Sequence, residues 1–282
     1  ANNMEQVQAI VDAAAEEHAP VILQVSQGAI RYAGLSFAAA MVKAAAAEVD
    51  VPVVLHLDHG TDFEQNVRCM RAGFTSLMYD GSKHPFDVNV ANTRRVVELA
   101  DIIGVPVEAE LGKVLQSSEN VRVVLGGFSM TYPAAALRSV ELTGGSSLAV
   151  AIGSVHAMKS AEAELDIARL KKLRAAVEIP FVLHGSSGVK EESELEAIEN
   201  GICKINVATM LNQAFTRGLL AAQKEDPTNV DPRKWLLASR EAVKEVVRHK
   251  IRLFGGSGKV TAAGFVTPKT LHRGVEIGGT EE

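Results

Sequence analysis

The chain has 282 residues, of which 47% are hydrophobic and 22% are charged, as is typical of globular proteins. Its formal net charge of −5 provides no global positive field, so we expect no nucleic-acid partner and a local site for any anionic substrate. No apolar run approaches the length of a membrane span and the start does not resemble a signal peptide, so we expect no membrane partner. The two cysteines form no metal-type pair and favour a reducing, cytoplasmic compartment.

Apolar, β-branched runs alternate with amphipathic helical segments in this sequence. The opening helix is expected to place Met4, Val7, Ile10 and Val11 on one face. Strands are expected near residues 21, 53, 76, 107, 147, 181 and 203. Later helices are expected at 36–48, after 61–62, and at 86–103, 133–143, 167–177, 191–200 and up to about 253. Strands that alternate with helices predict a parallel sheet.

The count of strands predicts a (β/α)8 TIM barrel from which the first strand is missing. Seven strands are recognisable and the chain opens on a helix, so an eighth strand would belong before Ala1. We expect one barrel domain over 1–259 and a flexible C-terminal extension over 260–282. The strands near 21 and 203 would then have open edges that destabilise the barrel. The alternative is an open doubly wound sheet, although no G-x-G-x-x-G follows the first strand.

Three apolar strands each lead to one histidine. His59 follows 53–58, His156 follows 149–153, and His184 follows 181–183. Each histidine lies beside Gly, Ser or Ala, at the end where a barrel places its active residues. Three imidazoles with an open fourth position are typical of a catalytic zinc site. His56 lies inside its strand, and we interpret it as a packed residue or as a support for a ligand.

Carboxylates end the same strands. Asp58 either supports the neighbouring ligand or acts as a general acid/base. Asp80 and Glu110 either bind a second cation or make polar bonds at the barrel rim.

Two later segments are typical of phosphate binding. Gly185, Ser187 and their neighbours follow a histidine strand, and 206–209 ends the last strand. In TIM barrels, loops after the last two strands frequently bind phosphate through backbone N–H groups.

The residues resemble the class II, metal-dependent ketose-bisphosphate aldolases, which include fructose- and tagatose-bisphosphate aldolases. The resemblance covers roughly residues 1–259. The motifs that carry it are HLDHG at 56–60, VEAELG at 107–112, LAVAIG at 148–153 followed by His156, VLHGSSG at 182–188, GICKINVAT at 201–209 and RLFG at 252–255.

The resemblance implies a role for each of these groups. His59, His156 and His184 would bind catalytic Zn²⁺, and Asp58 would be the acid/base on the aldehyde oxygen. Asp80 and Glu110 would belong to an alternate metal position. The residues that would hold the dihydroxyacetone-phosphate end or position the substrate are Ser26, Gly185, Ser187, Asn206 and Thr209. The resemblance also implies a monovalent cation (Na⁺ or K⁺), a homodimer or homotetramer, and reversible cleavage of a ketose 1,6-bisphosphate to dihydroxyacetone phosphate and glyceraldehyde 3-phosphate.

The sequence departs from the family pattern at two places. Ala157 follows a ligand histidine where the family has Gly. In the loop at 113–121 the family's proton-abstracting Glu falls on Ser118 by spacing, and we expect the adjacent Glu119 to act as a substitute base. These departures motivate one alternative, a weakly active or non-catalytic relative that retains the metal. A separate alternative is a zinc-dependent barrel hydrolase, although the phosphate-type motifs argue against it. The choice between fructose and tagatose, which differ at C4, is also open.

Overall fold

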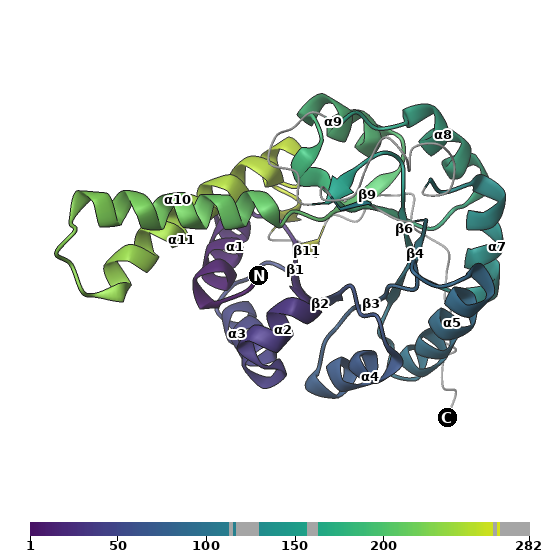
Figure 1. The fold of residues 1–282 in the computed structure, drawn as a ribbon, viewed down its shortest axis with the longest axis horizontal. Helices are drawn as coiled ribbons and strands as arrows, with labels where there is room; N and C mark the ends of the chain where they lie inside the picture. Colours follow the sequence, from purple (N-terminus) through teal and green to yellow (C-terminus); the bar gives the residue numbers. More distant parts are fainter. Residues whose placement is uncertain (113–114, 117–129, 157–162, 262–263, 266–282) are drawn as a thin grey trace.

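The computed structural model describes residues 1–112, 115–116, 130–156, 163–261 and 264–265. Parallel strands form an inner ring and helices surround it (Figure 1). The strands of the ring are β1 (Val21–Ser26), β2 (Val53–Asp58), β3 (Leu77–Tyr79), β4 (Val107–Leu111), β6 (Ser147–Val150), β8 (Phe181–Leu183) and β9 (Ile202–Ile205).

The order of these strands confirms the barrel. β3, β4, β6, β8 and β9 form one parallel sheet, β1 pairs with β2, and a bridge between His56 and Ser76 joins the two sheets. The strands therefore follow one another in chain order. A doubly wound sheet would reverse direction at a switch point, so that alternative is wrong.

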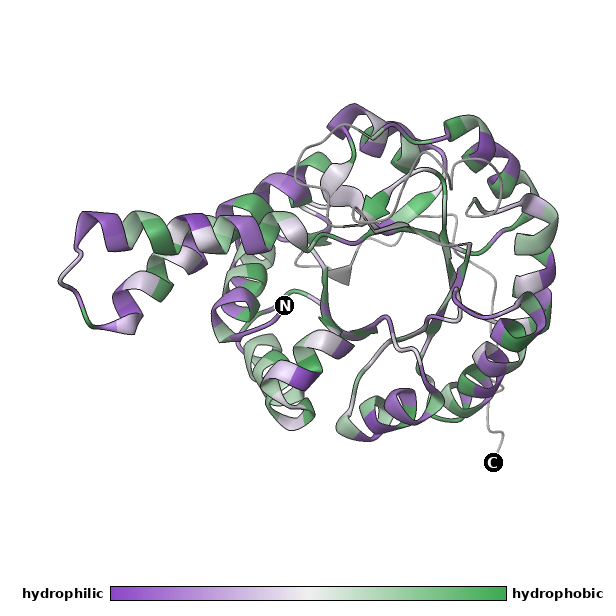
Figure 2. Cartoon of the chain, in the orientation of Figure 1, coloured by the Kyte–Doolittle hydropathy of each residue, from purple (hydrophilic) through white to green (hydrophobic). Residues whose placement is uncertain are grey.

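The helices pack their apolar faces against the ring and turn polar residues outward (Figure 2). Side-chain caps fix several starts; Asn3 Oδ1 accepts from the Gln6 N–H at the start of the first helix. No helix in the described part of the chain is long and apolar enough to cross a membrane. The helices are α1 (Met4–Glu16), α2 (Gln27–Ala33), α3 (Leu35–Ala47), α4 (Phe63–Ala72), α5 (Phe86–Ile102), α7 (Pro133–Thr143), α8 (Ile167–Ala176), α9 (Glu191–Glu199), α10 (Thr209–Glu225) and α11 (Pro232–Leu253).

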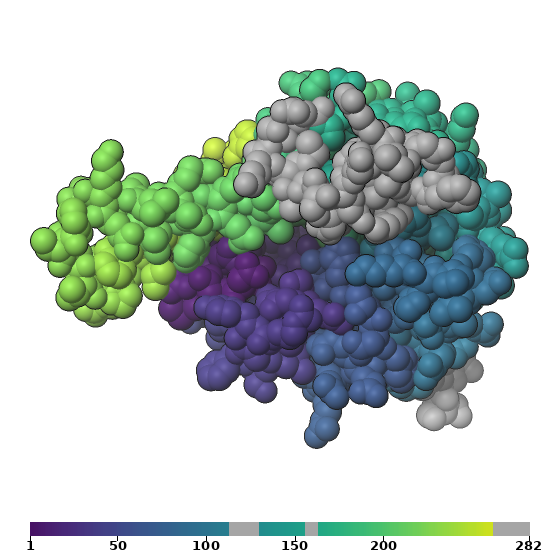
Figure 3. All heavy atoms as spheres, in the orientation of Figure 1, coloured from purple at the N-terminus to yellow at the C-terminus, as the bar shows by residue number. Residues whose placement is uncertain are grey.

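Three boundaries differ from the sequence-based expectation. Helix α2 was not expected; Ser26 caps it through its hydroxyl. β9 ends at Ile205, earlier than expected, and Thr209 already begins α10. The helical run up to 253 is two helices, because Asp231 and Pro232 provide a cap and an N1 proline for a new start. The two helices form an arm that projects from the barrel (Figures 1 and 3).

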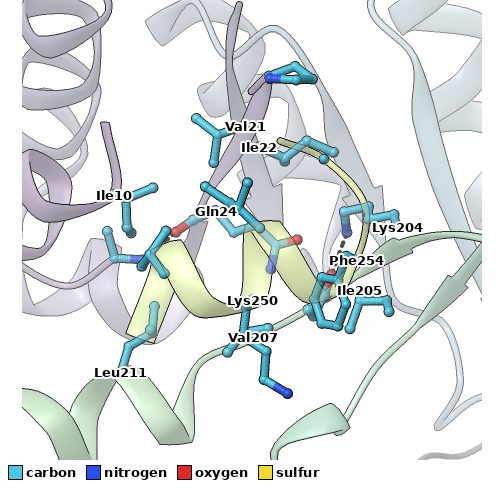
Figure 4. A pocket seen from close by; sticks show the side chains of 16 residues that line it. Ile10, Val21, Ile22, Gln24, Lys204, Ile205, Val207, Leu211, Lys250 and Phe254 are labelled. Carbon is cyan, nitrogen blue, oxygen red and sulfur yellow. Dashed lines mark hydrogen bonds between the residues drawn. The ribbon is translucent and has the colours of Figure 1, made fainter. Parts of the chain in front are cut away.

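A groove separates β1 from β9, where the sequence predicted open strand edges. Among the described residues, β1 pairs only with β2, and β9 pairs only with β8. The groove encloses a cavity of about 240 Å³, and Val21, Ile22 and Ile205 line it together with Phe254 of α11 (Figure 4). The consequence for stability stays a prediction.

The segment after residue 259 is described only in part. β10 (Val260–Thr261) and β11 (Gly264–Phe265) pair antiparallel, and the Val260 N–H donates to the carbonyl of His18. Residues 266–282 lie outside the described residues, so the expected domain boundary and flexible extension stay predictions.

Candidate metal centre and active site

The end of β2 directs two consecutive side chains toward one site. Alternation along a strand would send Asp58 and His59 to opposite faces. His59 instead has a φ of 51°, in the left-handed region that non-glycine residues rarely adopt. Gly60 permits the turn, because a Cβ there would lie 2.6 Å from the Met78 carbonyl oxygen. The strand end therefore releases His59 to join Asp58.

Two imidazole nitrogens converge at this site. His59 Nε2 and His184 Nδ1 are 3.1 Å apart, although 125 residues separate them in sequence. Each ring faces a carboxylate with its other nitrogen: His59 Nδ1 is 2.9 Å from Asp80 Oδ2, and His184 Nε2 is 2.8 Å from Glu108 Oε1. Ionised carboxylates only accept hydrogen bonds, so these two nitrogens carry the protons. The other two nitrogens, His59 Nε2 and His184 Nδ1, then face each other, so a single proton or a single cation between them can interact with both.

The donor atoms at this point fit a divalent metal. Asp58, His59 and His184 each offer one ligand atom, and these atoms lie within 4.8 Å of one another. Imidazole with carboxylate is a common ligand set for Zn²⁺. The carboxylates behind the two rings fix their orientation, as supports of metal-binding histidines generally do.

The third expected ligand is described only through its backbone. His156 ends the short strand β7 (Val155–His156), which pairs with β5 (Leu115–Gln116). Its side chain lies outside the described residues, as do Ala157, Ser118 and Glu119. The roles of His156 and Glu119 therefore stay predictions.

A second cluster shares His59. Its imidazole, Asp80 and Glu110 also offer ligand atoms within 4.8 Å of one another, which matches the expected alternate metal position. The pKa of Glu110 is raised to about 8. Burial is the largest cause, and the charge of Asp80 raises the pKa by more than the charge of His59 lowers it. Glu110 Oε2 is buried without a hydrogen-bond partner in the described part of the chain and lies 3.6 Å from His59 Nδ1. A cation would satisfy this oxygen.

Asp58 has the charge state of a base. Burial alone would raise the pKa of its carboxyl, but the charges of His59, His184 and Lys204 outweigh burial and lower it. The Nδ2 of Asn206 donates to Asp58 Oδ1 over 3.2 Å. Asp58 is thus ionised, oriented, and within reach of the metal position.

Sequence reasoning missed two charged residues below the site. Glu108 and Lys204 lie on β4 and β9, and their side chains form an ion pair at 2.8 Å. Both interrupt apolar strands at positions that face the barrel interior, and this was the signal available in the sequence. His56 is buried beside them, and burial together with the charge of Lys204 lowers its pKa to about 3; the ring is neutral.

The expected phosphate-binding residues lie around the ends of β8 and β9. Gly185 has a φ of 68° and leads into a short 3₁₀ helix that contains Ser187. Thr209 is the first residue of α10, whose N-terminus has no side-chain cap. Helix N-termini with free N–H groups favour anions. Ser26 ends β1, and its hydroxyl accepts from the Ala29 N–H.

Comparison with known proteins decides the family. The model of the family "Fructose-bisphosphate aldolase class-II" matches residues 1–259. The chain belongs to this family. It is 41% identical to the fructose-bisphosphate aldolase of Thermus caldophilus over 92% of each chain. It is 43% identical to the probable fructose-bisphosphate aldolase of Bacillus subtilis (strain 168), over 92% of this chain and 91% of that one.

Solved structures of aldolases share the fold. The YdjI aldolase of Escherichia coli K12 matches 92% of this chain and 90% of its own, with a TM-score of 0.77 and 35% identity. A putative fructose-1,6-bisphosphate aldolase from Coccidioides immitis covers the same shares, with a TM-score of 0.80 and 27% identity.

As a class II aldolase, the chain is a carbon–carbon lyase that cleaves a ketose bisphosphate to triose phosphates with the help of a divalent metal. The expected sugar-bisphosphate substrate is thereby confirmed, and the hydrolase and non-catalytic alternatives are set aside. Weak activity rests on Ala157 and on Ser118, which lie outside the described residues, and it stays a prediction.

Proposed function

We propose that this class II aldolase reversibly cleaves fructose 1,6-bisphosphate to dihydroxyacetone phosphate and glyceraldehyde 3-phosphate. The choice of sugar rests on the names of the relatives from Thermus caldophilus and Bacillus subtilis. The observation that carries the metal chemistry is the convergence of His59 Nε2 and His184 Nδ1 at 3.1 Å. These two residues and His156 would hold Zn²⁺. A bound Zn²⁺ polarises the ketose carbonyl and stabilises the charge that develops when the C3–C4 bond breaks.

Asp58 serves as the acid/base in this proposal. In cleavage its carboxylate takes the proton of the C4 hydroxyl, and in condensation it returns a proton to the aldehyde oxygen. The lowered pKa of Asp58 supports the first role, because the group is ionised at neutral pH. In the same proposal Glu119 is the base for dihydroxyacetone phosphate: it removes and returns a proton at the carbon that takes part in the C3–C4 bond.

The phosphate of the dihydroxyacetone end is held where β8 and β9 end. The uncapped N-terminus of α10 and the turn after Gly185 supply N–H donors. In this proposal the phosphate site is formed by Gly185, Ser187, Asn206 and Thr209. Ser26 helps to position the substrate, and a monovalent cation, Na⁺ or K⁺, accompanies the phosphate.

We also propose a homodimer or homotetramer located in the cytoplasm. The arm of α10 and α11 supports assembly, because it extends past the barrel and exposes Leu220, Val230 and Leu237. Exposed large apolar side chains on a projecting element are available to a partner.

The test of the substrate assignment is a comparison of two sugars that differ only at C4. Purified protein loaded with Zn²⁺ is given fructose or tagatose 1,6-bisphosphate, and triose phosphate release is followed. We expect a higher kcat/KM for the fructose compound. A higher value for tagatose overturns the substrate, and release of inorganic phosphate in place of triose phosphate overturns the reaction.

A further inference from the structure

The interior of the barrel contains an ion pair that belongs to neither the metal cluster nor the phosphate site. Glu108 on β4 and Lys204 on β9 are not on neighbouring strands, since β6 and β8 lie between them. Their contact therefore crosses the barrel interior below the site, at 2.8 Å between Nζ and Oε2. The exposed fractions of the two side chains are 2% and 13%. Figure 4 shows Lys204 on the wall of the groove between β1 and β9.

The pair is connected to both reactive parts of the site. Glu108 accepts from His184 Nε2 with its other oxygen at 2.8 Å. Lys204 also donates to Asn206 Oδ1 at 2.7 Å, and the Nδ2 of Asn206 donates to Asp58. One ammonium group is thus linked to the metal-facing imidazole through a carboxylate and to the acid/base through an amide.

Each of these two links fixes an orientation, one of the His184 ring and one of the Asn206 amide, that the other contacts of these residues leave open. A carboxylate paired with an ammonium acts as an acceptor, so Glu108 holds the proton of His184 on Nε2 and leaves Nδ1 for a metal. An amide side chain can present either its oxygen or its nitrogen to a neighbour. The bond from Lys204 to Oδ1 turns the Nδ2 of Asn206 toward Asp58.

We propose that Lys204, acting with Glu108, is a positioning residue that holds His184 in its metal-binding tautomer and orients the amide of Asn206 on Asp58. This inference rests on the proposed metal site. It extends that site by two residues that touch neither metal nor substrate.

The matched control is a second buried ion pair. Lys250 of α11 donates to Glu194 of α9 at 2.7 Å, and the side chains are 6% and 0% exposed. This pair has the same chemistry but does not contact the metal cluster. Lys250→Met reports what the loss of a buried ion pair does to stability alone.

The experiment measures metal affinity by competition with a chromophoric chelator, and the visible spectrum of the Co²⁺-loaded protein. We expect Lys204→Met and Glu108→Gln to weaken Zn²⁺ binding about 10–100-fold, as the loss of a ligand-orienting group typically does, and to change the Co²⁺ spectrum. Lys204→Arg should recover part of the affinity, because the charge and the donors remain. The double variant should lose little more than either single variant, because both act through one link.

The control variants separate the possible outcomes. Lys250→Met should retain the parent affinity and Co²⁺ spectrum. If Lys204→Met and Glu108→Gln both bind metal within about twofold of the parent, or if Lys250→Met loses as much, the positioning role is wrong. Glu108→Gln nearly preserves volume, so it tests the claim even if Lys204→Met does not fold. His184→Ala tests the proposed site itself: if that variant binds metal as tightly as the parent, the site is wrong, and the positioning role is wrong with it.

Discussion

The chemistry of this aldolase depends on which nitrogen carries the proton in the imidazole rings of His59 and His184. The carboxylate of Asp80 accepts a hydrogen bond from His59 Nδ1–H, and that of Glu108 accepts one from His184 Nε2–H. The remaining nitrogens then face each other across 3.1 Å. His59 reaches the same point as its neighbour Asp58 because the backbone of His59 is left-handed.

Replacing Asp58 by Asn should separate metal binding from catalysis. The amide keeps the shape and the contact with Asn206, and the three proposed ligands, His59, His156 and His184, are unchanged, so we expect Zn²⁺ content to stay near that of the parent. It cannot accept the C4 hydroxyl proton, so kcat should fall about 10²–10⁴-fold. Metal analysis and steady-state kinetics on the same sample check this. An unchanged kcat would reduce Asp58 to a structural support.

Metal affinity should rise with pH through the neutral range. Burial lowers the pKa of His59, but the hydrogen bond to Asp80 and the charges of Asp58 and Glu110 prevail and raise it to about 9. A metal must therefore displace a proton from this ring below that pH. Between about pH 7 and about pH 8 we expect Zn²⁺ affinity to increase about tenfold.

The sign for the metal-free protein is the opposite. The pKa of His59 in the folded protein lies above the ordinary imidazole value of 6.5. Protonated His59 therefore stabilises the fold fully below about pH 6.5, and this contribution is lost as the pH rises toward 9. Chelator competition and urea unfolding at both pH values check the two trends. A metal affinity that does not change between them would contradict the assignment of His59.

At the scale of elements, the strands were predictable because each is an apolar run with Pro or Gly close to one of its ends. The seven strands and their chain order agree with the sequence reading. Helix α2 was missed because its start depends on a cap from Ser26, a residue that also ends a strand. The pair of Glu108 and Lys204 was missed because 96 residues separate its members, and only barrel closure brings such positions together.

Helix α11 is held against α9 by the buried pair of Lys250 and Glu194. Removing the ammonium leaves a buried carboxylate without its partner, so Lys250→Met should lower the free energy of unfolding by about 3 kcal/mol. Urea denaturation measures this change. Lys190→Met is the control, because its partner Glu164 and the lysine are both exposed; we expect a loss of less than about 1 kcal/mol. Equal losses of unfolding free energy in the two variants would show that burial of the Lys250–Glu194 pair does not increase its effect on stability.

For the whole molecule, the arm of α10 and α11 is the feature that a lone barrel does not need. Light scattering after size exclusion should give a dimer or tetramer for the parent. A charged pair of substitutions, Leu220→Lys with Leu237→Lys, should shift the mass to the monomer, because ammonium groups cannot be buried cheaply at an interface. Ile102→Lys on α5, away from the arm (Figure 1), is the matched exposed control and should not change the mass. A monomeric parent, or dissociation of the control, contradicts the arm as the interface.

The central claim is that the charge left by breaking the C3–C4 bond is stabilised by a metal that strand-end histidines hold. No lysine of the chain takes part in this stabilisation. The most direct measurement is fructose 1,6-bisphosphate cleavage by one preparation before chelation, after chelation, and after Zn²⁺ is restored, each with and without borohydride in the presence of substrate. We predict loss of cleavage on chelation, full return with Zn²⁺, and no inactivation by borohydride. Cleavage at full rate in the chelated protein, or irreversible inactivation by borohydride, would contradict the account.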